Sequence, residues 1–157
     1  MTLGPVVIGY DGSPAADRAL REVADLLPGR SALVVTVWEP GAAFTLAEPM
    51  FVPAPIDIRV AQEVDEALYD QARHLAEQGA ARLRELGLDA DGLAVADTLT
   101  IPETLVRLAR ERDAAAIAVG AHGHSRVREL VLGSTIQAVV RKAECPVLVV
   151  READADS

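Results

Sequence analysis

Short apolar runs alternate with segments of helical periodicity along most of this chain, and this alternation is what most constrains its fold. The runs are Pro5–Tyr10, Ser31–Trp38, a stretch within Leu88–Leu99, Ala114–Val119 and Pro146–Val150. Strands that are apolar along their length are buried on both faces, which is typical of a parallel sheet covered by helices. We therefore expect an α/β fold with right-handed crossovers between its strands.

The segments between these runs predict helices over Ala15–Leu27, Ile56–Leu86, Pro102–Arg112 and Thr135–Lys142. Ser13 followed by proline is a typical helix start, and Gly87 a typical helix end. The segment Glu39–Pro55 holds four prolines, so we expect no regular helix there. Connections of this length in compact domains are often functional.

Length and composition favour one globular domain. The 157 residues are half apolar and one quarter charged, and the low aromatic content of 3% predicts an aliphatic core. We assign residues 1–150 to this domain and residues 151–157 to a polar C-terminal tail.

The formal net charge of -9 argues against binding to nucleic acid or to an anionic membrane surface. No run reaches the roughly 20 apolar residues of a membrane span. Cys145 is the only cysteine, so no internal disulfide can form, and we interpret it as a small buried residue. With no signal peptide visible, the expected location is the cytoplasm.

A glycine motif follows the fourth apolar run. It comprises Gly120, Gly123, Gly133 and Ser134, with Val119 and Thr135 on its flanks. A strand that leads through glycines into a helix start presents free N–H groups, which suit phosphate, and glycine permits close approach. The alternative is turn chemistry without a ligand.

Asp11, at the end of the first run, could accept hydrogen bonds from a base, a ribose or the water shell of a cation. Its alternative role is to stabilise the turn before the first helix. Arg126 and Arg128 could reach a terminal phosphate or lie on a solvated face. His122 and His124 lack a third nearby ligand, so no metal site of the protein's own is expected.

Several catalytic motifs are absent from the sequence. It contains no G-x-x-x-x-G-K-S/T loop, no G-x-G-x-x-G after the first run and no G-x-S-x-G elbow. No nucleophile, base and orienting residue stand out. The residues alone therefore predict no particular catalytic activity.

Three stretches resemble the universal stress protein family, in its ATP-binding subgroup: V-I-G-Y-D-G-S, V-G-A-H-G-H-S-R with L-G-S-T, and C-P-V-L-V-V. The resemblance covers about Leu3 to Val150. It implies a Rossmann-like five-stranded parallel sheet in the order 3-2-1-4-5 with helices on both faces. It also implies ATP binding, Mg²⁺ held through the phosphates, little or no turnover, and a homodimer.

The resemblance also implies individual roles. Asp11 would contact the nucleoside, the Val37 backbone would read the adenine edge, and Gly9 and Tyr10 would line the base and ribose. Gly120 would lie near the ribose and α-phosphate. The remaining motif residues, Gly123, Gly133 and Ser134, would hold the phosphates, with Val119 and Thr135 beside them and Arg126 a candidate for the terminal phosphate. One departure is Thr100, at a position where the family usually has glycine, which could tighten the rim of the site.

The sequence thus predicts an ATP-binding stress-response regulatory protein that couples nucleotide occupancy to an unknown protein partner. The alternatives are a slow ATPase of the same fold and a dimeric scaffold without nucleotide. We expect a homodimer through Pro146–Val150, because an apolar edge strand presents unpaired N–H and C=O groups.

Overall fold

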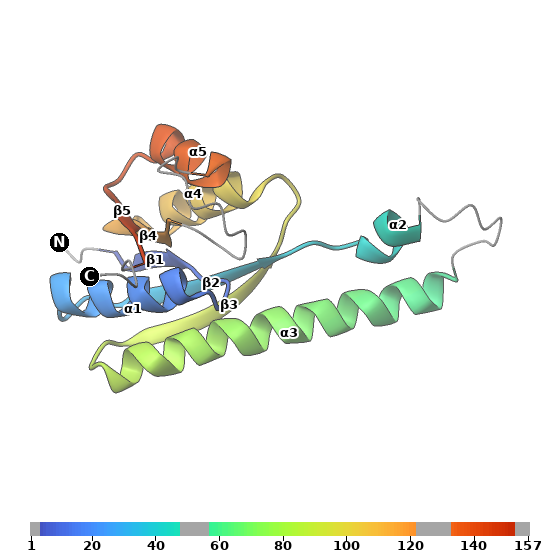
Figure 1. Cartoon of the computed structure of the whole chain (residues 1–157), viewed down its shortest axis with the longest axis horizontal. Coiled ribbons are helices and arrows are strands. Elements are labelled where there is room, and N and C mark those ends of the chain that lie inside the picture. The colour runs from blue at the N-terminus through green and yellow to red at the C-terminus, as the bar shows by residue number, and fades with distance from the viewer. Residues whose placement is uncertain (1–3, 48–56, 122–132, 153–157) are drawn as a thin grey trace.

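The computed structural model describes residues 4–47, 57–121 and 133–152. Its elements are β1 (Val6–Gly9), α1 (Pro14–Leu26), β2 (Ala32–Trp38), α2 (Ala42–Ala47), α3 (Ile58–Glu85), β3 (Ala90–Ala96), α4 (Ile101–Glu111), β4 (Ala116–Gly120), α5 (Ser134–Lys142) and β5 (Val147–Val150). The strands form one parallel sheet in the order β3-β2-β1-β4-β5 (Figure 1). The predicted fold class and strand order are confirmed.

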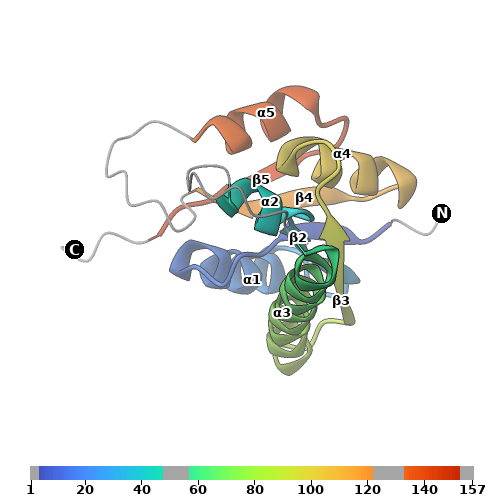
Figure 2. The ribbon, with the colours of Figure 1, turned by 90° about the vertical axis from the view of Figure 1, so that its right-hand side faces the viewer.

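Helices cover both faces of the sheet, α1 and α3 on one face and α4 and α5 on the other (Figure 2). Alternate strand residues supply the two cores because successive side chains of a strand point to opposite faces. Ile8 and Val34 pack with α1 and α3, whereas Val7 and Val35 pack with α4 and α5. The two-sided burial explains why these strands are apolar throughout.

The helix ends lie within two residues of their predicted positions. Ser13 caps α1, since its Oγ accepts a hydrogen bond from Ala16 N at 3.1 Å. Asp57 caps α3 in the same way, with Oδ1 accepting from Arg59 N at 2.9 Å. Such caps satisfy N–H groups that have no partner within the helix.

The expectation of no helix within Glu39–Pro55 is wrong, because α2 occupies Ala42–Ala47. The prolines that motivated it lie outside this stretch, at Pro40 and in the residues after α2. The six residues Ala-Ala-Phe-Thr-Leu-Ala contain no helix breaker and include alanine and leucine, which favour helix.

Helix α3 has 28 residues and is therefore about 42 Å long at 1.5 Å per residue. Its C-terminal half covers the sheet, and its N-terminal half extends past the sheet beside α2 (Figure 1). In the part of the chain that the structure describes, no helix combines the length and hydropathy needed to cross a membrane.

Candidate functional site

A cleft of about 850 Å³ opens at the carboxyl edge of the sheet, where β1, β2 and β4 end beside the start of α5. This volume lies within the roughly 300–1,000 Å³ typical of small-molecule sites. The strand order reverses around β1, whose neighbours are β2 and β4. Ligands of open α/β sheets bind outside the carboxyl ends of the strands at such a reversal.

Nine of the eleven predicted site residues line this cleft: Gly9, Tyr10, Asp11, Val37, Val119, Gly120, Gly133, Ser134 and Thr135. The other two, Gly123 and Arg126, lie outside the described residues, as do His122, His124 and Arg128. Residues from four separate elements therefore converge on one volume.

Val37 offers its backbone to the cleft. In β2, Val35 O accepts from Tyr10 N at 2.8 Å, whereas Trp38 O accepts from Asp97 N at 2.7 Å on the β3 side. Because alternate residues of a strand direct their polar groups to opposite neighbours, the Val37 N–H and C=O point to the β1 side. The β1 register ends at Gly9↔Val35, so these groups face the cleft beyond the end of β1.

Asp11 stabilises the turn that leads into α1. Its Oδ1 accepts a hydrogen bond from Ser13 N at 2.9 Å. The intervening Gly12 has φ +76°, a conformation that favours glycine. The turn role foreseen as the alternative for Asp11 is therefore present, and its carboxylate lines the cleft as well.

Tyr10 directs its hydroxyl away from the cleft, into a polar network between α1 and α3. The hydroxyl donates to Asp17 Oδ1 at 2.6 Å, and Arg82 also pairs with Asp17. Burial, reinforced by the bond to Asp17, raises the pKa of Tyr10 to about 12. The Tyr10 carbonyl accepts from Thr36 Oγ1 at 2.9 Å. The Tyr10 hydroxyl therefore serves to connect α1 with α3.

Gly120 and Gly133 are glycines for different reasons. A Cβ on Gly120 would lie 2.8 Å from the carbonyl carbon of Ala15, so packing of β4 against α1 requires glycine there. Among the described residues, a Cβ on Gly133 would meet nothing within 4 Å. The Gly133 backbone, with φ -55° and ψ 155°, is also open to other residues.

The start of α5 lacks a side-chain cap. Gly133 is its N-cap and forms no side-chain hydrogen bond, whereas Ser13, Asp57 and Thr100 cap α1, α3 and α4. Among the described residues no side chain caps the first N–H groups of α5, which lie at the cleft beside the exposed Ser134 and Thr135.

The described lining is mostly apolar and includes residues that sequence reasoning missed. These are Ser13, Ala16, Val35, Thr36, Leu75, Ile101, Leu105, Ala121, Ile136 and Gln137. Among the described lining residues Asp11 is the only carboxylate, and none is lysine or arginine. Of these residues, only Thr36 could have been singled out from the sequence, because it places a hydroxyl within an apolar strand. Leu75 and Ile101 reach the cleft from helices whose placement the sequence does not specify.

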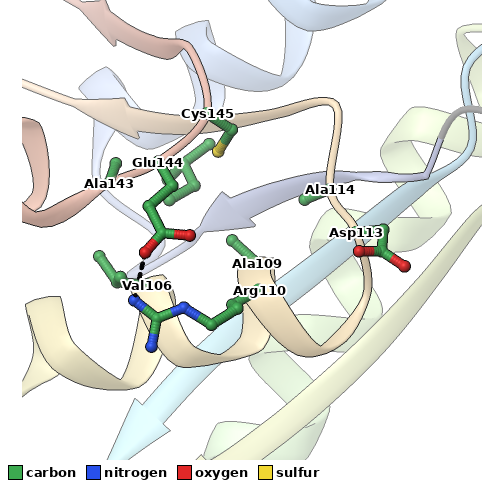
Figure 3. A pocket seen from close by; sticks show the side chains of 9 residues that line it. Val106, Ala109, Arg110, Asp113, Ala114, Ala143, Glu144 and Cys145 are labelled. Carbon is green, nitrogen blue, oxygen red and sulfur yellow. Dashed lines mark hydrogen bonds and ion pairs between the residues drawn. The ribbon is translucent and has the colours of Figure 1, made fainter.

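A smaller cavity of about 160 Å³ lies between α4 and the start of β5 (Figure 3). Arg110 pairs with Glu144 across it at 2.9 Å, and Cys145 lines it. Cys145 is half-buried, less enclosed than expected, because it stands just before the edge strand β5. Burial raises its pKa, which keeps the thiol protonated and a weak nucleophile.

The model of the Universal stress protein family matches residues 3–151. A universal stress protein from Thermus aquaticus is 32% identical over 152 residues, covering 93% of this chain and 97% of that protein. Universal stress protein MJ0577 of Methanocaldococcus jannaschii is 30% identical over 90 residues, covering 57% of this chain and 54% of that protein. Universal stress protein Slr1230 of Synechocystis is 47% identical over 49 residues, which cover 31% of this chain and only 17% of that protein.

Solved structures share the fold. The structure of MJ0577 superposes with a TM-score of 0.74 at 23% identity, covering 98% of this chain and 100% of that chain. A universal stress protein from Archaeoglobus fulgidus in complex with dAMP has a TM-score of 0.62 at 23% identity, with 96% and 99% covered. A universal stress protein in complex with cAMP has a TM-score of 0.62 at 22% identity, with 97% and 100% covered.

Proposed function

This chain belongs to the universal stress protein family, and from that premise we propose that it binds ATP with Mg²⁺ in the cleft at the carboxyl edge of its sheet. Occupancy of the cleft would regulate a protein partner in the stress response. Two structural neighbours are complexes with the adenine nucleotides dAMP and cAMP, which supports the ligand class.

The backbone of Val37 is the observation that carries the base assignment. A C=O and an N–H on one residue match the adenine edge, where the N6 amino group donates and N1 accepts. Guanine presents O6 and N1–H in the same places, so its acceptor and donor are reversed. Apolar side chains of Val37, Ile101 and Leu105 line the same cleft and suit the faces of a planar base.

The start of α5 supports the phosphate assignment. Its first N–H groups carry the partial positive charge of a helix N-terminus and favour an anion. Ser134 adds a hydroxyl at this position. Mg²⁺ would be held through phosphate oxygens, and within the described residues no group of three or more His, Cys, Asp or Glu could hold a metal ion.

Calorimetry with ATP, AMP, adenosine and GTP tests this proposal. We expect ATP to bind more tightly than adenosine, because of these two only ATP uses the start of α5. We also expect ATP to bind more tightly than GTP, because guanine reverses the donor and the acceptor that face Val37. Mass spectrometry of the nucleotide released on acid denaturation of the purified protein is an independent readout. Equal binding of GTP and ATP would remove the base assignment, and no binding of any of the four would refute the proposal.

Asp11 belongs to the nucleoside end of the proposed site. Replacing Asp11 with alanine should weaken ATP and adenosine by similar factors, because the lost contact is not to phosphate. Asp11→Asn is the matched control, since an amide oxygen can still accept from Ser13 N. If Asp11→Ala weakens ATP alone, the carboxylate acts instead through the cation that accompanies the phosphates.

The residues that line the cleft also lead us to expect slow hydrolysis of ATP. Asp11 is the only carboxylate among the described lining residues, and its Oδ1 already accepts from Ser13 N. General-base catalysis contributes typically about 10²–10⁴ in rate. We expect turnover well below about 1 per second, the low end of ordinary enzymes. A faster rate in a phosphate-release assay would favour the ATPase alternative.

A further inference from the structure

A second surface of the molecule lies on the part that extends past the sheet. We call it the arm and define it as residues 38–47 and 57–73: the end of β2, α2 and the first half of α3. Figure 1 shows that the arm projects from the body, so its sides are not covered by the other helices.

Aromatic side chains gather on the arm. The chain has only five aromatic residues, and three of them, Trp38, Phe44 and Tyr69, lie there. Trp38 and Tyr69 form an edge-to-face pair with centroids 5.8 Å apart. Phe44 is 48% exposed and Tyr69 is 42% exposed. Aromatic residues dominate the binding energy of protein interfaces, so their exposure on one projection indicates a contact surface.

Ile58 extends this surface along α3. It is 69% exposed and precedes Tyr69 by 11 residues, which is close to three helical turns and places both on one face. Asp65 lies on that face too, and its Oδ1 accepts a hydrogen bond from Gly41 N at 2.9 Å. This bond ties the segment before α2 to α3 and holds the two sides of the arm together. A contact surface that is already held in place costs less conformational entropy on binding.

The charge of the arm selects its partner. Its carboxylates are Glu39, Asp57, Glu63, Asp65, Glu66 and Asp70, against two arginines, Arg59 and Arg73, one of which pairs with Asp70. A second arm would meet this surface with the same sign of charge, which disfavours self-association through it. Carboxylates beside exposed aromatic rings suit arginine or lysine, through ion pairs and cation–π contacts.

We propose that the arm is a docking surface for a basic segment of another protein, one that presents arginine or lysine beside apolar side chains. This surface is separate from the nucleotide cleft.

A synthetic helical peptide with one leucine face and one arginine face is the probe, and the same peptide with glutamate for arginine is its control. Trp38 is the only tryptophan, so its emission reports contact at the root of the arm. We expect the arginine peptide to bind and to shift this emission, and the glutamate peptide to do neither. Phe44→Ala and Tyr69→Ala should each weaken binding at least tenfold, with an unchanged circular dichroism spectrum.

Two matched controls separate the arm from general attraction to an acidic protein. Leu26→Ala removes an apolar side chain that is 58% exposed on α1, away from the arm, and should leave the affinity unchanged. Glu63→Lys with Glu66→Lys should weaken binding far more than Asp25→Lys with Glu85→Lys, which changes the net charge equally. Equal losses in the two charge variants, full affinity in both aromatic variants, or no binding of the arginine peptide would overturn the proposal. None of these results depends on ATP.

Discussion

Three glycines around the cleft have three different physical causes. Gly12 adopts a positive φ in the turn after β1, and Gly120 leaves room for the backbone of α1. Gly133 has neither constraint within the described part of the chain, because its backbone is ordinary and a Cβ would meet no described atom within 4 Å. Glycine is also acceptable at an N-cap, but serine, asparagine and aspartate are better there. Close approach of a ligand is the remaining reason for glycine at this position.

Gly133→Val tests that reason. The described residues leave room for the new side chain, but in the bound state it would stand where phosphate approaches the start of α5. We expect the affinity for ATP to fall at least tenfold, about 1.4 kcal/mol, and the affinity for adenosine to change little. Calorimetry measures both, with Arg141→Val on the last turn of α5 as control. An unchanged affinity for ATP would place the phosphates elsewhere.

Tyr10 predicts a loss of stability at alkaline pH. Its pKa rises from 10.0 to about 12 in the fold, chiefly through burial. A group whose folded pKa is raised stabilises the fold fully below its unfolded pKa, and this contribution is lost as the pH rises through the folded value. The free energy of unfolding should therefore fall between about pH 10 and 12.

Urea unfolding at a series of pH values measures this loss, and Tyr10→Phe should be less stable below pH 10 yet lack the alkaline decline. Absorbance of tyrosinate gives a second readout, since Tyr10→Phe leaves Tyr69 as the only tyrosine. Ionisation of Tyr10 in its ordinary range in the folded protein would contradict the burial argument.

Among the elements, α4 shows how one residue adjusts the rim of the cleft. Thr100 caps α4: its Oγ1 accepts from Glu103 N at 3.3 Å and donates to Glu103 Oε2 at 3.0 Å. Glu103 Oε1 also accepts from Lys142 Nζ of α5 at 2.8 Å, and this ion pair lowers the pKa of Glu103. Thr100 thus connects the start of α4, where Ile101 lines the cleft, with the end of α5.

Thr100→Ala should lower the free energy of unfolding by about 1 kcal/mol, the usual effect of losing an N-cap. Thr100→Gly should lower it by less, about a few tenths of a kcal/mol, because glycine is tolerated at an N-cap. Urea denaturation of the three proteins gives the comparison. If alanine and glycine prove equally harmless, the hydroxyl does not stabilise α4.

The elements were predictable where the signal is local. Apolar runs such as Ala114–Val119 identify strands, and Ser13 marks the start of α1 through its own side chain. Helix α2 was missed because prolines nearby outweighed a short run that contains none. The roles of Tyr10 and Gly120 could not be predicted, since they depend on Asp17, Arg82 and Ala15, which only the folded chain brings next to them.

Across the whole molecule, single strands link the cleft with two other surfaces. On β2, Val37 faces the cleft and the next residue, Trp38, contacts Tyr69 of the arm. On β4, Val119 and Gly120 line the cleft and pair in register with Val149 and Val150 of β5. A ligand in the cleft would therefore contact the strands that support the arm and the β5 edge. This arrangement gives the proposed coupling to a partner a short physical path.

The β5 edge is where we propose that two copies of the chain join. Pro146 O accepts a hydrogen bond from Ile117 N of β4, and Val150 O accepts one from Ala121 N, just after β4. Alternation along the strand then directs the N–H and C=O of Val147 and Val149 outward, to the open edge of the sheet. Unpaired polar groups along an edge strand invite a further strand, and an antiparallel second β5 across a two-fold axis would satisfy them.

Val149→Pro tests this dimer, because proline removes an outward N–H and leaves the bonds to β4 in place. The two-fold axis repeats the loss in both copies, so we expect the dimer to shift to monomer. Ala94→Pro is the matched control on β3, the opposite edge strand. Asp97 N donates to Trp38 O of β2, so by alternation along β3 the N–H of Ala94 points away from β2, to the other edge of the sheet. Light scattering distinguishes the states: the parent and the Ala94 variant should have twice the 16.6 kDa mass of one chain, and the Val149 variant the single mass. A parent protein of single mass would refute the dimer, and a Val149 variant that stays fully dimeric would place the interface on another surface.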